Sequence, residues 1–366
     1  MPSKDPDFTS VPTAAPQPAP APTSPDGPKR SPVWRSWLGR AVTVRDVPPP
    51  WEAWLLGVLS LLTVGAVWWF LTRPGHRIVD AYTLPTPEQT FRSFKSLWFE
   101  RELSISAITS LGRVLGGFLV ATAIAVPLGV IAGSYVRVNA FLRPLSIFGR
   151  NVPIAALIPL TLIWFGLGEV QKIMFIFLAT VAFVLFDTTN AVLAVPSRYL
   201  DTAYTLGMHR TLKKGARLAA IFGSIYGSAA AFGWHLLNDS TVSLASEMGS
   251  AGFWARFFGA SFLGFCLWLP IEGHQVLRKV LLPLAMPDIV NSLRLIFGLA
   301  FGYVMLAEVI NARHGLGALI IMSQRQGPRE HIYLCLIIIS LLAWGIDRGI
   351  LRLQRHLFPH LKNGEN

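Results

Sequence analysis

The sequence is poor in charge and in cysteine. Only 14% of its 366 residues are Asp, Glu, Lys or Arg, against about a quarter in a typical soluble domain. Its two cysteines, Cys266 and Cys335, lie far apart in apolar runs, which predicts small hydrophobic core residues rather than a disulfide. The sequence has no Cys/His cluster with metal-ligand spacing and no GxxxxGK[ST] phosphate-binding loop. We therefore expect no metal, nucleotide or other cofactor on this chain.

What the sequence has instead is long apolar runs. Hydrophobic residues make up 52% of the chain, and several uncharged runs approach or exceed the roughly 20 residues that cross a bilayer. The predicted fold class is an all-α polytopic membrane protein. The net charge of +12 could suggest nucleic acid, but Lys and Arg retained in cytoplasmic loops explain it better. We expect membrane lipid around the chain and no nucleic-acid partner.

The N-terminal region differs from the rest in composition. Residues 1–50 contain 13 of the 26 prolines, with Ala, Ser and Thr between them, which predicts a disordered tail. The first apolar run is preceded by Lys29, Arg30, Arg35, Arg40 and Arg45, which place this tail in the cytoplasm. Residues 51–72 are the first predicted transmembrane helix, with tryptophans near both ends as interfacial anchors.

Further apolar runs predict the remaining spans. They lie at about 106–134, 152–168, 172–195, 288–310 and 330–351. Pro153 and Pro159 predict a kink in the third span, and residues 311–328 form an outer segment that could dip into the membrane. His314 and His331, near this segment, are expected to be solvated. Basic residues after the last span place the C-terminus in the cytoplasm.

Two amphipathic pieces interrupt this pattern, Ser197–Arg210 and His274–Pro287. We interpret them as a cytoplasmic docking loop. Ser197 could cap a short helix after Pro196, Ala203 and Gly207 give that helix a small-residue face, and Gly207 allows a sharp turn. An ordinary amphipathic helix at the membrane surface is the alternative.

These two pieces resemble the signature loop of permease subunits of bacterial ABC importers. That signature reads Glu-Ala-Ala, three residues, Gly, nine residues, an aliphatic residue, any residue, Leu-Pro. Its halves stand here as residues 201–207 (DTAYTLG) and 280–283 (VLLP). Segments similar to the nitrate/sulfonate/taurine branch of that family are LPTP (84–87), SLGRVLGGF (110–118), LIWFGLGE (162–169), LRLIFGLAF (293–301), AEV (307–309) and GLGALI (315–320).

The resemblance implies an architecture and a set of partners. It covers residues 84–355, and it implies a MetI-like permease fold with six core-type transmembrane helices in the bacterial inner membrane. The chain would be a non-enzymatic subunit of a homodimer, working with separate ABC ATPase subunits and a periplasmic or lipoprotein substrate-binding protein. The solute would be small and anionic or organic, such as nitrate, a sulfonate, taurine or a vitamin precursor. The residues implied in ATPase coupling are Asp201, Ala203, Tyr204, Leu206, Gly207, Met208, Leu282 and Pro283.

The sequence departs from the family pattern in two ways. Asp201 and Thr202 replace Glu and Ala, and the shorter carboxylate still suits a helix N-terminus. Gly207 and Pro283 are 76 positions apart where the signature has 13, so about 63 residues, 211–273, are inserted in the loop. Two apolar runs in this insertion favour an extra membrane hairpin, with close packing predicted at Gly223, Gly227 and Ala231. The alternative is a cytoplasmic helical insert.

Ionisable residues inside spans are costly and often functional. We expect the substrate path among Asp187, Asn190, Asn291, Arg294 and Glu308, with Arg113 as a further candidate. An arginine on the path could guide an anion, although snorkelling to the interface is the alternative for Arg113 and Arg294. Arg294 and Glu308 are fourteen residues apart on one helix, too far to pair directly if it is straight.

Two other classes of protein compete with the permease reading. A stand-alone secondary transporter or channel would be expected to show inverted repeats, and we find no convincing internal repeat. It would also leave the docking-loop motif unexplained. A membrane enzyme would need convergent His, Asp, Glu or Cys residues at span ends, and no such constellation is present.

Overall fold

The computed structural model describes residues 48–73, 78–80, 82–208, 212–238, 251–272 and 275–358. Within these ranges the chain is helical and contains no β-strand. Nearly all of the predicted tail, residues 1–50, lies outside them. The chain divides into two units, residues 1–66 and 67–366, which are described separately.

Helix α2, Pro50–Thr72, matches the first predicted span closely and carries the first unit into the second. Of its residues only Thr72 is buried, so its apolar side chains are free to face lipid. In the second unit, the Trp68 indole donates a hydrogen bond of 3.0 Å to the carbonyl oxygen of Pro85. Two short helices follow, α3 (Pro87–Arg92) and α4 (Phe94–Phe99). Thr86 and Gln89 form a capping box that begins α3.

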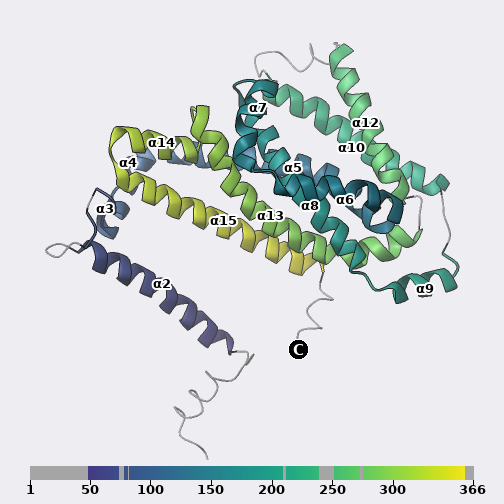
Figure 1. Ribbon diagram of the computed structural model, residues 1–366, viewed down its shortest axis with the longest axis horizontal. Helices are drawn as coiled ribbons and strands as arrows, with labels where there is room; N and C mark the ends of the chain where they lie inside the picture. The colour runs from purple at the N-terminus through teal and green to yellow at the C-terminus, as the bar shows by residue number, and fades with distance from the viewer. Residues whose placement is uncertain are drawn as a thin grey trace, which may run out of the picture. The chain divides into compact units, whose positions relative to one another are not determined.

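The core of the second unit is built on three long helices that lie against one another (Figure 1). They are α5 (Leu103–Ser134), α8 (Glu169–Leu193) and α13 (Leu282–Asn311). Glycines let α5 approach α8 closely, because a Cβ at Gly117 would lie 2.6 Å from the carbonyl oxygen of Ile173. Phe175 and Phe301 are fully buried at the centre of this packing.

The third predicted span is wrong as a single kinked helix. The chain forms α6 (Val136–Asn151), a 3₁₀ turn (Ile154–Ala156) and α7 (Leu157–Phe165), and the two parts are bent by 86°. The break falls at Val152–Pro153, where proline both lacks a backbone donor and disfavours helix in the residue before it. Helix α7 is too short to cross a bilayer alone, so this segment is a broken span or a re-entrant one.

The C-terminal half of the unit is continuous helix. A π-helical turn, Leu277–Leu281, leads directly into α13. The outer segment forms α14 (Leu316–Gln326), which packs against α13 and α15, and α15 runs from Arg329 to Leu357. Five described helices are long and apolar enough to cross a membrane, or six if the bent pair counts as one span. This agrees with the six core-type helices predicted.

The insertion forms two helices side by side, α10 (Leu212–Asn238) and α12 (Ala251–Glu272) (Figure 1). The predicted close packing is confirmed: a Cβ at Gly223 would lie 2.5 Å from the carbonyl oxygen of Ser261, and Ala231 is fully buried. The pair also packs against α5, where the Tyr226 hydroxyl donates to the carbonyl oxygen of Ala123. Residues Ala219–Ala231 of α10 form an apolar helical stretch.

Candidate functional site

The docking-loop motif begins on the short helix α9, Ser197–Thr205. It ends in a Schellman motif. The amide of Met208 donates to the carbonyl oxygen of Ala203 at 3.2 Å, and the amide of Gly207 donates to that of Tyr204 at 3.0 Å. Gly207 has φ +75°, which only glycine adopts at no steric cost. The sharp turn predicted at Gly207 is therefore present.

One predicted detail of α9 is wrong. Ser197 is the first helical residue, Pro196 occupies the N-cap position, and no side chain caps the helix there. Proline supplies the extended backbone, with ψ 136°, that lets the chain enter the helix.

The second half of the motif lies next to α9 despite the intervening insertion. Val280–Pro283 belongs to the π-helical turn and the first turn of α13, and α9 contacts that turn. Leu200 of α9 packs against a buried cluster that includes Leu277 and Leu281. The insertion thus separates the halves in sequence but not in space. His274–Pro287 was expected to be part of a loop, but from Gln275 onwards it is helical and leads into the membrane helix.

Helix α9 presents a mixed surface to its surroundings. Asp201, Tyr204, Leu206 and Gly207 are exposed, with Leu206 at 74%, whereas Ala203 is buried against the bundle. Met208 and Leu282 are half-buried, and Pro283 is exposed. An exposed leucine and tyrosine beside a carboxylate can bind an apolar groove on another protein.

Glu308, predicted on the substrate path, is instead fully buried in a polar network. Its carboxylate accepts from Ser110 Oγ at 2.7 Å, from the Gly317 amide at 2.9 Å and from Arg113 Nη1 at 2.6 Å. The Leu316 amide in turn donates to Ser110 Oγ at 2.9 Å. These bonds tie the N-terminal part of α5 to the end of α13 and the start of α14.

Arg113 extends this network to α8. Its guanidinium forms a bidentate pair with Glu169, with Nε to Oε2 at 2.6 Å and Nη2 to Oε1 at 2.7 Å. Lys172 Nζ lies 2.8 Å from Glu169 Oε1. Arg113 and Lys172 are buried, whereas the Glu169 side chain is 46% exposed. Two acids and two bases therefore balance in charge where four helices meet, which is what buried ions require.

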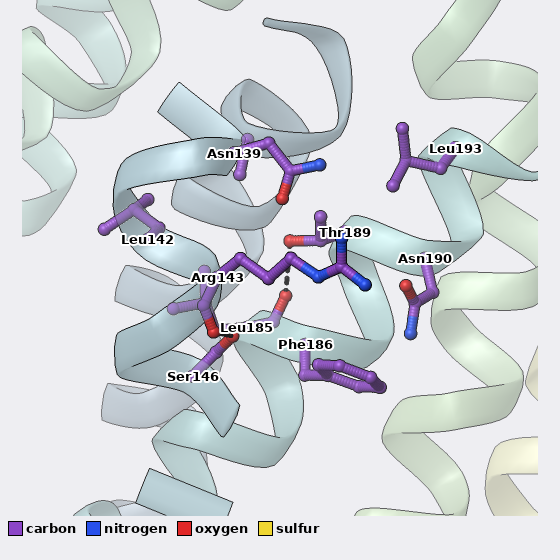
Figure 2. A pocket seen from close by; sticks show the side chains of 10 residues that line it. Asn139, Leu142, Arg143, Ser146, Leu185, Phe186, Thr189, Asn190 and Leu193 are labelled. Carbon is purple, nitrogen blue, oxygen red and sulfur yellow. Dashed lines mark hydrogen bonds between the residues drawn. The ribbon is translucent and has the colours of Figure 1, made fainter. Parts of the chain in front are cut away.

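The other predicted path residues lie apart from this network. Arg294 Nε is 3.1 Å from Asp347 Oδ1 on α15, so it pairs with neither Glu308 nor a residue of its own helix. Asn291 is exposed, and Asp187 is half-buried, with Arg150 as its electrostatic neighbour. Asn190 lines a cavity of about 140 Å³ between α5, α6 and α8 (Figure 2).

Two minor expectations are corrected in part. His331 is buried on α15, with Nε2 2.8 Å from Ser96 Oγ, whereas His314 is exposed as predicted. Cys335 is fully buried as predicted, but Cys266 is exposed; both are free.

Sequence reasoning considered Arg113 and Glu308 separately and missed Glu169 and Lys172. A signal was available, because all four residues lie towards the outer ends of their spans in the predicted topology. Charged residues at the same depth on neighbouring helices are candidates for pairing. Which helices are neighbours follows only from the packing.

Comparison with known proteins identifies what this architecture resembles. The family model described as "Binding-protein-dependent transport system inner membrane component" matches residues 125–239 and 271–363. The interruption, residues 240–270, lies within the predicted insertion 211–273, whereas the first part of that predicted insertion, residues 211–239, is included in the match.

Curated relatives cover most of the chain. It is 25% identical to SsuC of Bacillus subtilis, named for aliphatic sulfonates transport (83% of this chain, 87% of the relative), and 24% identical to the taurine transport system permease TauC of Escherichia coli (89% and 92%). It is 23% identical to the bicarbonate transport system permease CmpB of Synechococcus elongatus (84% and 89%). A solved inward-facing MetNI methionine ABC transporter is similar over 72% of this chain and 98% of its own, with 16% identity and a TM-score of 0.48.

Proposed function

We propose a solute class and a coupling mechanism for this chain, which belongs to the family of binding-protein-dependent transport system inner membrane components and is an ABC importer permease subunit. The solute is a small molecule with an oxoanion group, and the energy comes from separate ATPase subunits that dock on α9. The chain itself hydrolyses no ATP.

The observation that carries the coupling mechanism is the geometry of α9. Its nine residues end in a Schellman motif at Gly207, it rests on the bundle through Leu200 and Ala203, and it leaves Tyr204 and Leu206 exposed. A rigid short helix with an apolar tip is suited to fit a groove on a partner, because little side-chain entropy is lost on docking. The residues implied in coupling lie on this helix or on the adjoining start of α13.

The bundle offers a direct route from α9 to its opposite end. Helix α8 begins at Glu169 in the buried network and ends at Leu193, just before α9. At 1.5 Å per residue it is about 36 Å long. In the mechanism we propose, movement of α9 by the ATPases tilts α8, and the Arg113–Glu169–Glu308 network makes the outer ends of α5, α8, α13 and α14 move together.

The remaining partners follow from the family. We propose a homodimer of this chain, two ATPase subunits, and a substrate-binding protein on the face opposite α9, with both termini of the chain in the cytoplasm. The solute class is supported by the names of the relatives, which specify aliphatic sulfonates, taurine and bicarbonate. Each of these carries a sulfonate or carbonate-type oxoanion.

Docking can be tested by changing the exposed tip of α9. Leu206→Gln removes apolar surface without touching the core, since this side chain is 74% exposed. We expect the variant to lose most co-purification with the cognate ATPase and most solute-dependent ATPase activity in nanodiscs, at unchanged expression and melting temperature.

The matched control is Leu357→Gln, which changes another exposed leucine, at the end of α15. It should retain both assembly and ATPase activity. Full assembly and activity in Leu206→Gln, or an equal loss in both variants, would contradict docking on α9.

A further inference from the structure

A cavity between α5, α6 and α8 has the features of a ligand site that neither the docking helix nor the buried network uses. Its volume is about 140 Å³, enough for several waters or one small solute. It lies at the end of α8 that precedes α9, since Leu193, the last residue of α8, is part of its lining.

The cavity carries positive charge without a negative counterpart. Of the residues that line it, Arg143 is charged and none is acidic. The nearest acid in sequence, Asp187, has Arg150 as its electrostatic neighbour. Among the described residues, the Arg143 guanidinium has no ion-pair or hydrogen-bond partner, although the side chain extends across the cavity towards Asn190 and the ring of Phe186 (Figure 2).

Some of the polar side chains around Arg143 already donate hydrogen bonds within the protein, and others do not. The hydroxyl of Thr189 donates to the carbonyl oxygen of Leu185, and that of Ser146 donates to the carbonyl oxygen of Arg143. Within the described chain, the side-chain amides of Asn139 and Asn190 have no such partner. A guanidinium fork and two amide groups are thus free to donate hydrogen bonds to one ligand.

From this arrangement we infer that the cavity binds a small organic oxoanion, with its sulfonate, carboxylate or phosphate oxygens on Arg143, Asn139 and Asn190. A guanidinium pairs with such groups in a bidentate manner. Leu142, Leu185 and Phe186 give the rest of the cavity an apolar lining that accommodates a short carbon chain. The inference concerns these residues alone and does not depend on docking at α9.

The test is calorimetric titration of propane-1-sulfonate into the full-length chain in phosphatidylcholine nanodiscs. Loss of charge-assisted hydrogen bonds in Arg143→Gln should raise the Kd about tenfold or more. Arg137→Gln removes the same charge from an exposed position on α6 outside the cavity, and its Kd should stay within about twofold of wild type. Asn190→Ala should also weaken binding, and it serves as the second variant if Arg143→Gln does not fold.

A second arm distinguishes a free solute from a lipid head group. Phosphatidylglycerol in the nanodiscs would weaken the apparent affinity for propane-1-sulfonate if the lipid phosphate competes for the site. The lipid should then have no effect on the affinity of Arg143→Gln. An unchanged affinity would identify the free solute. Both results support an oxoanion site. Absence of propane-1-sulfonate binding, or an equal loss in the Arg143 and Arg137 variants, would overturn it.

Discussion

At the scale of single residues, burial decides which ion pairs matter. The Arg113–Glu308 pair at 2.6 Å and the Arg92–Glu88 pair at 2.7 Å have nearly the same length, but the first is buried and the second is 80% and 71% exposed. Exposed pairs contribute little because water and salt screen them. Removing one member of a buried pair leaves an uncompensated charge in low dielectric.

We therefore predict that Glu308→Gln lowers the free energy of unfolding by about 3 kcal/mol. Glu88→Gln, its surface control, should lower it by less than about 0.5 kcal/mol. Denaturant titration in detergent micelles measures both values. A double variant of Glu308→Gln with Arg113→Gln should lose less than the sum of the two single changes, by more than about 1 kcal/mol. Strict additivity would show that the two side chains do not interact.

Gly315 lets the chain pass beside the same network. Its φ is +139°, and an added Cβ would lie 2.5 Å from Glu308 Cδ and 2.7 Å from Arg113 Nη1. Gly327 also has positive φ, +107°, but has open space around it. We predict that Gly327→Ala costs about 1 kcal/mol from backbone strain alone. Gly315→Ala should cost at least about 2 kcal/mol more, measured by the same titration; equal costs would rule out the steric contact with the network.

The network also marks the limit of sequence reasoning about residues. Spacing on one helix correctly excluded a direct pair between Arg294 and Glu308, because helix geometry is local. The actual partners, Asp347 for Arg294 and Arg113 for Glu308, come from other helices. Such pairs depend on which helices are neighbours, and a single sequence does not contain that information in any local pattern.

At the scale of elements, α9 depends on one backbone conformation. The Schellman bonds require a left-handed residue at position 207, and the absence of any atom within 4 Å of a Cβ there leaves backbone strain as the only cost of substitution. Asparagine tolerates this conformation better than alanine, and β-branched valine tolerates it least.

We predict that ATPase activity in the assembled transporter falls in the order Gly207, Gly207→Asn, Gly207→Ala, Gly207→Val. The valine variant should lose most activity, because the turn that ends α9 no longer forms. Rates of solute-dependent ATP hydrolysis measure the series, with Gly233→Val as a control at an open position on α10. Equal rates across the series would show that coupling to the ATPase does not depend on the geometry of this turn.

Long helices were predicted far better than their interruptions. The runs that became α2, α5, α8, α13 and α15 each contain a long and mostly apolar stretch, so length and hydropathy identify them. The bend between α6 and α7 was missed because α6 is amphipathic and contains basic residues. A search for apolar runs assigns such a segment to a loop. The helical second half of the docking motif was missed for a related reason, since its continuity with α13 depends on packing against α9.

At the scale of the whole molecule, the predicted insertion separates the two halves of the signature loop in sequence, and one contact bears on its depth in the membrane. Ala123, which accepts from Tyr226, lies 11 residues before the end of α5, or about 16 Å along the helix axis. Tyr226 lies 14 residues into α10, or about 21 Å. These similar depths fit a hairpin that enters the membrane beside α5 better than one packed beneath it.

We therefore predict that the link between α10 and α12 faces the side of the membrane opposite α9. In a background without Cys266 and Cys335, single cysteines are placed at Ser243 in the link, at Glu88 after α2 and at Leu357 at the end of α15. A membrane-impermeant maleimide added outside spheroplasts should label Ser243→Cys and Glu88→Cys, but should label Leu357→Cys only after lysis, because in the proposed topology α2 and the hairpin each cross from a cytoplasmic start. If Ser243→Cys is labelled only after lysis while Glu88→Cys is labelled both before and after it, the insertion is instead a re-entrant or cytoplasmic hairpin. Such a hairpin would put the link on the side where the ATPases are proposed to dock, so the same measurement decides whether the insertion can touch them.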